Sequence, residues 1–379
     1  MEPGELIEVT VDKLVAGGDG LARADDGRVV FVTGALPGER VRATVRKVRK
    51  DVAFADISEA LEPSADRAEP PCAHVAEGCG GCDWQHLAPG AQARAKREIV
   101  IDALSRVGGI SGVDVAPTIE LPAIGYRQRV RFVVDHGRPA YRAARTNKPI
   151  PVDSCTILHP HLEAAMFKAD WSASREVELA YGTETGETLR VAPTRHQPDR
   201  VGTYHEVVAG RRFRISARSF FQIRTDGAEA LVALVRAALG EDIEHLADLY
   251  AGVGLFAATI PAANVVAIEG NPSAVADCRH NLADHPNAKV HRLSVERWRA
   301  KQDYDAVVAD PSRQGLGLEG VDAVVRTRAP RVALVSCDVA AMARDVRDLL
   351  DAGYQIAQVT PVDLFPMTSH IEIVTALTR

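Results

Sequence analysis

Apolar and polar residues alternate along the first sixty positions of the chain. The stretches LIEVTVDKLV, GRVVFVTGAL and ERVRATVRKV follow this pattern, and glycine-rich turns such as AGGDG and LPGE separate them. Alternation with a period of two is typical of half-buried strands, and turns at this spacing are typical of small closed sheets. We therefore expect residues 5–60 to form four or five short antiparallel strands in a small, OB-like β-barrel.

From about residue 226 the pattern changes to short apolar runs separated by helical periodicity. A helix at 226–240 precedes apolar runs at 246–250, 264–268, 305–309, 332–336 and 370–377. This alternation of strands and helices predicts a doubly wound, Rossmann-like α/β domain with a mostly parallel sheet.

The region between these two parts predicts a third unit. Residues 62–71 (EPSADRAEPP) are typical of a linker, a cysteine-rich stretch and a helix at about 90–107 follow, and residues 124–215 are rich in short strands and turns. We expect a multidomain protein with a barrel at 1–60, a β-rich central domain at 61–218 and an α/β domain at 219–379. For the segment at about 88–116, packing against the α/β domain is an alternative to packing within the central domain.

The composition places the chain among ordinary globular proteins. It is 46% apolar and 25% charged, and no apolar run approaches the roughly 18–20 residues of a membrane span. The N-terminal stretch MEPGELIEVTVDK lacks the basic and apolar regions of a signal peptide, so we expect a cytoplasmic protein whose thiols stay reduced. Six cysteines in that setting indicate metal ligands or catalysts rather than disulfides.

Two basic segments stand out against the net charge of −6, which argues mildly against a general binder of polyanions. Residues 40–50 (RVRATVRKVRK) carry six positive charges and no negative one, and residues 126–148 carry seven basic residues against the single Asp135. Both runs are suited to following a phosphate backbone. The alternative is a pair of solvated strand faces.

Four of the cysteines are spaced like ligands of one metal centre. Cys72, Cys79 and Cys82 have the spacing C-x6-C-x2-C, and Cys155 follows in VDSCTILHP. The glycines of C-G-G-C let the backbone turn tightly enough for two thiolates to face one centre. Four thiolates suit either zinc or an iron–sulfur cluster. A zinc site in which His74 or His86 replaces a thiolate also stays open.

The stretch LADLYAGVGLFAATI (246–260) predicts a strand, a glycine turn and the start of a helix. Gly252 and Gly254 let the backbone approach a ligand at the helix N-terminus. Glu269 closes the next strand, where a carboxylate can bond ribose hydroxyls. The sequence G-V-G-L-F-A also fits the dinucleotide-binding motif G-x-G-x-x-G/A. The loop alone therefore does not distinguish an NAD site from an S-adenosylmethionine site. Asp248, ahead of the glycines, is common in methyltransferases. A tight turn without a ligand is the structural alternative.

Three further polar residues lie at or near the ends of predicted strands. Asp310-Pro311 ends one strand rigidly, as in methyltransferases that bind planar amino or imide groups. Cys337, in VSCDVAAMARD, ends the next strand just before a helix, whose N-terminus is expected to lower the thiol pKa. Glu372 lies inside the last strand, with His370 two residues before it, and either side chain can act as a general base. Taken singly, each has a structural alternative as a turn, core or edge residue.

In this order the motifs resemble the RNA uracil-C5 methyltransferase family, in particular its iron–sulfur branch that modifies 23S rRNA. The resemblance covers nearly the whole chain. It comprises a TRAM-type barrel, the cysteine pattern and the stretches SFFQIRTDGAEAL, DLYAGVGLF, DPSRQG, SCDVAAMARD and FPMTSHIE. Two departures are small: DPSR replaces the more usual Asp-Pro-Pro/Ala-Arg, and Asp338 follows the cysteine where Asn is common.

The resemblance implies a role for each of these positions. Cys337 is implied as the nucleophile and Glu372 as the general base. A [4Fe-4S] cluster is implied on Cys72, Cys79, Cys82 and Cys155. Contacts with S-adenosylmethionine or the target base are implied for Gln222, Tyr250, Gly252, Gly254, Leu255, Glu269, Ser294 and Asp310.

The expected reaction is methylation of uracil C5, with RNA as the partner and 23S rRNA preferred over tRNA. Thiolate attack at C6 makes C5 nucleophilic, and a base then removes the C5 proton so that the thiolate can leave. We expect a monomer that binds neither DNA nor a membrane. The alternatives are a tRNA uracil-54 methyltransferase, a non-catalytic RNA-binding or maturation factor of the same fold, and an NAD-dependent iron–sulfur oxidoreductase.

Overall fold

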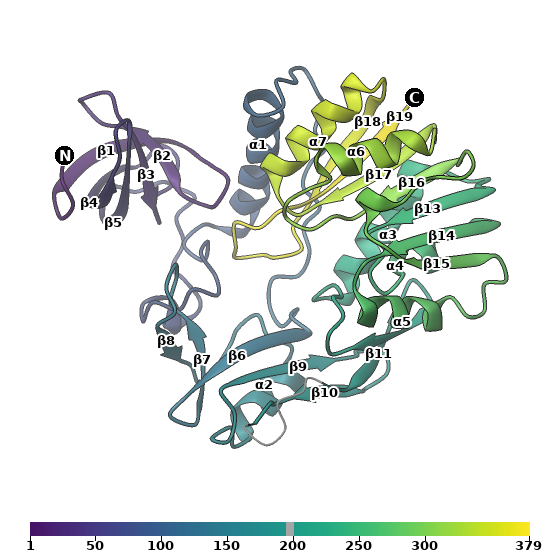
Figure 1. The fold of residues 1–379 in the computed structure, drawn as a ribbon. Helices are drawn as coiled ribbons and strands as arrows, with labels where there is room; N and C mark the ends of the chain where they lie inside the picture. The colour runs from purple at the N-terminus through teal and green to yellow at the C-terminus, as the bar shows by residue number, and fades with distance from the viewer. Residues whose placement is uncertain (195–200) are drawn as a thin grey trace.

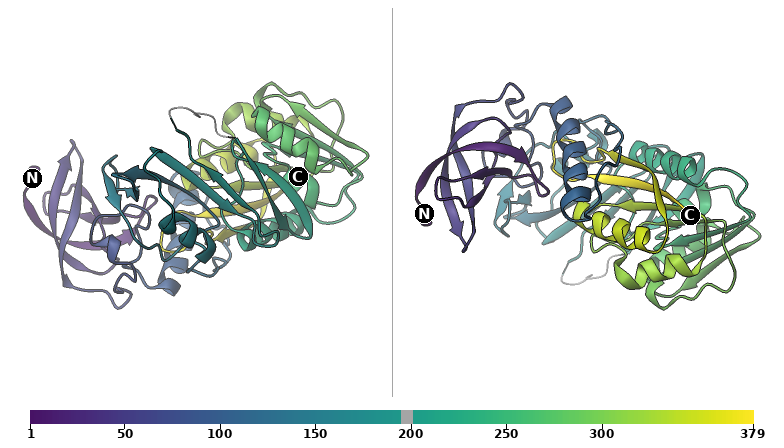
Figure 2. Two further views of the ribbon diagram at one scale, coloured as in Figure 1. Left: turned by 90° about the horizontal axis from the view of Figure 1, so that it is seen from below. Right: turned by 90° about the horizontal axis from the view of Figure 1, so that it is seen from above.

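A barrel, a β-rich layer and an α/β domain follow one another in the computed structural model, which describes residues 1–194 and 201–379 (Figure 1). The barrel lies at one end of the molecule and the α/β domain at the other, as both views of Figure 2 show. The β-rich layer and the cysteine segment lie between them. Three parts of the chain therefore meet near the middle of the molecule.

Five strands close the N-terminal barrel in the order β1-β2-β3-β5-β4. They are β1 (Leu6–Leu14), β2 (Gly20–Arg23), β3 (Val29–Thr33), β4 (Arg40–Val48) and β5 (Val52–Glu62). Alternate residues such as Val30, Val32 and Val41 point inward and are fully buried. The prediction of an all-antiparallel barrel is wrong for one pair, because β3 and β5 run parallel. That pairing closes the sheet and leaves no open edge.

The central part contains a five-stranded antiparallel sheet of order β10-β9-β6-β7-β8 and a separate hairpin of β11 and β12. Its strands are β6 (Arg129–Asp135), β7 (Arg138–Arg142), β8 (Pro149–Pro151), β9 (Glu176–Tyr181), β10 (Thr188–Val191), β11 (Thr203–Val208) and β12 (Arg211–Ser216). The short η1 (Ala73–Val75) and α2 (Pro160–Lys168) flank the sheet. Phe132, Leu162, Met166 and Trp171 form its core.

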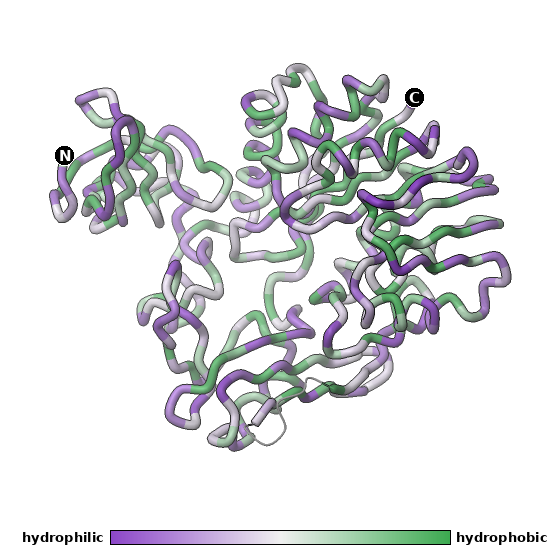
Figure 3. Tube along the Cα trace, in the orientation of Figure 1, coloured by the Kyte–Doolittle hydropathy of each residue, from purple (hydrophilic) through white to green (hydrophobic). Residues whose placement is uncertain are grey.

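The C-terminal domain has a seven-stranded sheet of order β15-β14-β13-β16-β17-β19-β18. Its strands are β13 (His245–Leu249), β14 (Asn264–Glu269), β15 (Ala288–Arg292), β16 (Ala306–Ala309), β17 (Arg331–Ser336), β18 (Gln355–Val362) and β19 (Glu372–Thr378). β19 runs antiparallel to both of its neighbours, and the other pairs are parallel. Figure 3 shows that the hydrophobic residues are concentrated on these strands.

Helices cover both faces of this sheet, as expected of a doubly wound domain. They are α3 (Thr225–Leu239), α4 (Leu255–Thr259), α5 (Pro272–Asn281), α6 (Gly317–Arg326) and α7 (Val339–Asp351), with the short η2 (Val295–Arg297). Two hydrophobic clusters, one on each face, contain alternate residues of the strands: Leu334 belongs to one and Val335 to the other.

The helix α1 (Pro89–Arg106) precedes the β-rich layer in sequence but packs on the C-terminal domain. It lies against α7 and β18, and the right-hand view of Figure 2 shows it beside the C-terminal strands. Arg347 of α7 donates a hydrogen bond of 2.6 Å to the carbonyl of Gly108, just beyond the end of α1. Within the described residues, no helix combines the length and apolar character needed to cross a bilayer.

Candidate active site

Cys337 and Glu372 are brought together by the antiparallel pairing of β17 with β19. The last registered pair is Ser336 with Ile373, so the next positions along the two strands are Cys337 and Glu372. Both side chains line a cavity of about 390 Å³, which lies at the carboxyl end of β17. Open α/β sheets bind ligands at this edge. The geometry therefore brings the predicted nucleophile and the predicted base to one site.

Burial controls the charges in this cavity. It raises the pKa of Glu372 well above its usual value, and the neighbouring Asp310 raises it further, while Arg313 opposes the shift. Burial also raises the pKa of Asp310 to about 7. The pKa of Cys337 rises to about 11 because of burial and the negative charges of Glu372 and Asp310. At neutral pH and without substrate, Cys337 is thus a thiol.

The expectation that the N-terminus of α7 lowers the pKa of Cys337 is wrong. Asp338 caps this helix, and its carboxylate accepts hydrogen bonds from the amides of Ala340 (3.0 Å) and Ala341 (2.8 Å). The first amides of the helix therefore face Asp338 and not the thiol. Burial beside two carboxyl groups then dominates the pKa of Cys337.

Two wall residues of the cavity were not singled out from the sequence. Phe220 is 68% exposed although it is aromatic, and it lines the cavity together with Arg313. An exposed aromatic face beside a nucleophile is suited to stacking on a planar base. Both residues lie in quoted motifs, SFFQ and DPSRQG, but no local signal distinguishes an exposed Phe from a core Phe. Gln222, two residues after Phe220, is buried.

The glycine loop leaves room for a ligand at one of its two glycines. A Cβ atom on Gly252 would meet nothing within 4 Å, whereas one on Gly254 would lie 3.0 Å from the Sγ of Cys278. The amide of Gly252 donates to the Glu269 carboxylate at 2.9 Å, so this acid at the end of β14 lies beside the loop. Tyr250 has a positive φ of 62°, which is rare for a residue with a side chain.

Asp248 has a structural role at the start of this loop. Its carboxylate is fully buried and accepts a hydrogen bond of 2.8 Å from the amide of Ala257, which fixes α4. Burial raises its pKa well above the usual value. Asp248 therefore orients the helix behind the loop.

The remaining candidate cofactor-binding residues differ in which of their groups can reach a ligand. The Leu255 side chain packs in the hydrophobic core, so only its backbone amide can reach a ligand. Ser294 is exposed and precedes η2. Tyr250 donates a hydrogen bond of 3.0 Å to Glu296 in η2. Glu296 is thus a polar neighbour of the loop that the sequence alone did not identify.

The four clustered cysteines line the same cavity as Cys337. Burial raises the pKa of Cys79 and Cys155, and that of Cys82 to about 12. Across the described parts of the chain, no three His, Cys, Asp or Glu side chains are arranged to hold a single metal ion. His74 has both ring nitrogens bonded, to Glu77 at 2.9 Å and Asp153 at 3.0 Å, and His86 is not on the cavity.

Three of the six basic residues in the barrel's run are paired with acids on the same surface. Arg40 bonds Glu8 (2.8 Å) and Glu62 (2.9 Å), Arg42 bonds Glu8 (3.0 Å) and Glu59 (2.5 Å), and Arg46 bonds Asp56. This arrangement fits the solvated strand face better than the phosphate track. In the second basic run, Arg127 lines the cavity and forms no ion pair with any residue that the structure describes.

Comparisons with known proteins agree with this arrangement. The TRAM domain family matches residues 1–58. Proteins named uncharacterized RNA methyltransferase from Streptomyces avermitilis and Gloeobacter violaceus are 33% and 32% identical, over 99% and 100% of this chain and 98% and 99% of theirs. The crystal structure of Pyrococcus abyssi tRNA (uracil-54, C5)-methyltransferase with S-adenosyl-L-homocysteine covers 98% of this chain and all of that chain, with a TM-score of 0.77 and 24% identity. The chain belongs to the family of RNA methyltransferases with an N-terminal TRAM domain.

Proposed function

We propose that this enzyme methylates C5 of a uracil in RNA, with S-adenosylmethionine as the methyl donor and 23S rRNA as the target. The observation that carries the proposal is the pair Cys337 and Glu372 on one cavity, which the exposed Phe220 also lines. A methyltransferase acting on a nucleophilic amine or hydroxyl needs no thiol there. A uracil C5 atom does, because it is too weakly nucleophilic without addition at C6.

The side chains of the cavity suit each step of that chemistry. The Cys337 thiol loses its proton to water as its sulfur bonds to C6, and the electrons of the C5=C6 bond move towards O4. S-adenosylmethionine supplies the electrophilic methyl group that C5 accepts. Glu372 then takes the C5 proton, the C5=C6 bond re-forms, and the C6–S bond breaks to release Cys337 as a thiolate. Asp310 or Gln222 holds the O4/N3 edge, and Phe220 stacks on the base, which must leave its own stack to enter.

The methyl donor is assigned to the glycine loop. The open space above Gly252 and the adjoining Glu269 carboxylate suit a nucleoside, with Tyr250, Gly254, the backbone of Leu255 and Ser294 around it. An NAD-dependent enzyme would use a similar loop, but it would not require Cys337 or Asp310. A thermal-shift comparison of S-adenosylmethionine with NAD separates the two, and stabilisation by NAD alone would exclude the methyl donor.

We further propose a [4Fe-4S] cluster on Cys72, Cys79, Cys82 and Cys155. Each thiolate of such a cluster binds a different iron, so the four sulfur atoms stand further apart than the ligands of one zinc ion. Four half-buried cysteines around one cavity suit the wider arrangement, and both nitrogens of His74 are already bonded. The cluster would join the 72–82 segment to Cys155. An anaerobic preparation should be brown and contain iron; a colourless, zinc-containing one would refute this assignment alone.

The deciding experiment incubates the enzyme with S-adenosylmethionine and 5-fluorouridine-substituted 23S rRNA or tRNA. Fluorine at C5 cannot leave as a proton, so the covalent complex should accumulate on a denaturing gel and be lost in Cys337→Ala. A complex with tRNA alone would favour tRNA, the substrate named for the Pyrococcus abyssi enzyme. No complex with either RNA, despite bound methyl donor, would favour a non-catalytic RNA-binding or maturation factor.

A further inference from the structure

The turn that precedes Glu372 carries much of the cavity wall. Residues 363–371 connect β18 to β19, and Phe365, Thr368 and His370 of this turn line the cavity with Glu372. Inside the turn, the Thr368 hydroxyl donates to the Phe365 carbonyl at 2.7 Å, and Met367 has a φ of +66°. The position of Glu372 therefore depends on how firmly this turn is held.

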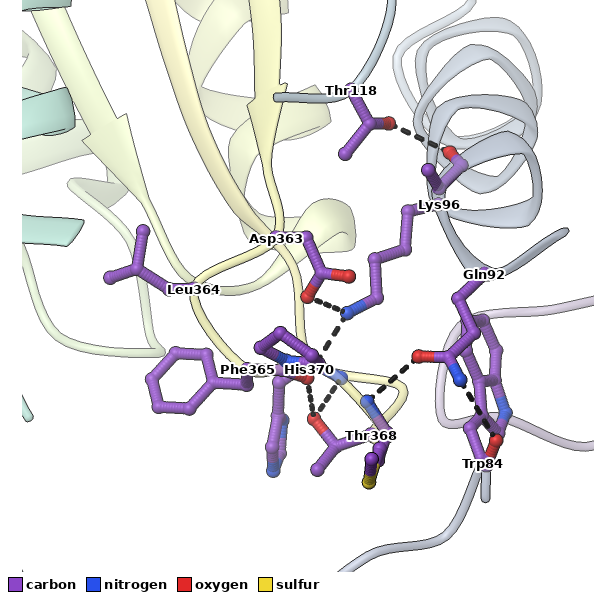
Figure 4. Close-up of polar contacts among 12 residues, drawn as sticks. Trp84, Gln92, Lys96, Thr118, Asp363, Leu364, Phe365, Thr368 and His370 are labelled. Carbon is purple, nitrogen blue, oxygen red and sulfur yellow. Dashed lines mark hydrogen bonds and ion pairs between the residues drawn. The ribbon is translucent and has the colours of Figure 1, made fainter. Parts of the chain in front are cut away.

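α1 supplies several of the contacts that hold the turn from outside, as Figure 4 shows. Lys96 donates to the carboxylate of Asp363 at 2.5 Å and to the Phe365 carbonyl at 3.2 Å. Gln92, one turn earlier on α1, accepts a hydrogen bond of 2.7 Å from the amide of Met367. The Met367 carbonyl accepts one of 2.9 Å from the amide of Trp84. A helix more than 260 residues away in sequence thus holds the part of the turn from Asp363 to Met367.

The buried ion pair of Lys96 and Asp363 adds little to the stability of the fold, because both charges lose their hydration. Lys96 is 0% exposed and Asp363 is 4% exposed. Burial lowers the pKa of Lys96 and raises that of Asp363, so desolvation works against the charged pair on both sides. Apolar residues of similar volume often replace a buried ion pair without loss of stability. What they cannot replace is the directed bond from the ammonium group to the Phe365 carbonyl.

We propose that Lys96 is a positioning residue for catalysis: its ammonium group fixes the turn at Asp363 and Phe365 and thereby holds Glu372 against C5 of the bound base. This inference rests on the proposed uracil-C5 reaction. A displaced Glu372 affects one step above all, the removal of the C5 proton, because addition of Cys337 and methylation precede it. Loss of Lys96 should therefore let the methylated covalent complex build up on ordinary, unfluorinated RNA.

The test compares Lys96→Met, the double variant Lys96→Met/Asp363→Leu, and Lys13→Met in the full-length enzyme. The double variant removes both charges, so it folds even where the single variant leaves Asp363 unpaired. Lys13→Met is the matched control, because Lys13 also forms a 2.5 Å ion pair with a carboxylate of α1, Asp102, but does not contact the turn. Each variant is mixed with unmodified RNA and S-adenosylmethionine, and turnover and the denaturant-resistant complex are measured.

We expect both Lys96 variants to lose about 10- to 100-fold in kcat, the effect of a misplacement of about 1 Å, with kcat/KM for RNA close to the wild-type value and with visible covalent complex. Lys13→Met should behave as the wild type. Wild-type kcat in the double variant, or a loss confined to KM, would overturn the positioning role. A wild-type enzyme that forms no complex even on 5-fluorouridine RNA would instead overturn the proposed function, and this inference with it.

Discussion

Cys337 and Glu372 are coupled through charge as well as through position. Burial and the negative charges of Glu372 and Asp310 raise the pKa of Cys337, and burial beside Asp310 raises the pKa of Glu372. Attack on C6 needs the thiolate, so the thiol proton has to leave before or during the binding of the base.

This coupling predicts a pH dependence for the first chemical step. The pKa of Cys337 is about 11, so the thiolate fraction grows about tenfold per pH unit below that value. The rate of covalent complex formation with 5-fluorouridine RNA should therefore rise with pH from about 6 to 9 in stopped single-turnover reactions. Cys337→Ala gives the blank. A rate independent of pH would mean that substrate binding itself removes the thiol proton.

Individual site residues were predictable where a strand pattern places them. Cys337 and Glu372 each flank an apolar run, and the antiparallel pairing brings them together. Lys96 was not predictable, because it lies within a helical pattern 267 residues from Asp363 and nothing local marks it as buried. The pKa of Cys337 was predicted in the wrong direction, since the sequence does not reveal that Asp338 uses the helix amides.

At the scale of elements, apolar runs identified five of the seven strands in the C-terminal sheet. β15 and β18 were missed, and both are edge strands. Residues of β15 are half-buried or exposed, so they form no apolar run. β18 is exposed over its first half and contains Pro361, which argues against a strand in sequence. The parallel pairing in the barrel was missed because alternation reports burial but not direction.

The turn between β13 and α4 gives a prediction at this scale. Gly252 and Gly254 both have positive φ, so alanine at either costs about 1–2 kcal/mol in backbone strain. Only Gly254 also meets a neighbour, Cys278. In thermal melts, Gly254→Ala should lower Tm more than Gly252→Ala. Gly252→Ala should lose more of the Tm increase that S-adenosylmethionine produces, since its methyl group enters the open space. Equal losses of that increase would contradict the assigned ligand space.

For the whole molecule, the barrel is fastened beside the cavity. Lys13 pairs with Asp102 of α1, and the indole of Trp84 donates to the Gly18 carbonyl at 3.1 Å. Arg145, from the β-rich layer, bonds Asp19 of the barrel at 3.1 Å. Gly17 lines a second cavity of about 580 Å³ that also contains Cys337 and Arg313. An RNA that delivers its base to Cys337 therefore meets the barrel loop at the same time.

These contacts predict which arginines bind RNA. Arg42 already forms ion pairs with Glu8 and Glu59, whereas Arg127 lines the cavity and forms no ion pair with any described residue. Arg127→Ala should weaken RNA binding and reduce the slope of log Kd against log salt by about 1, because one phosphate contact is lost. Arg42→Ala should leave both nearly unchanged. Filter binding at several salt concentrations measures the slope, and a larger effect at Arg42 would show that the RNA displaces the barrel's acidic partners and runs along its surface.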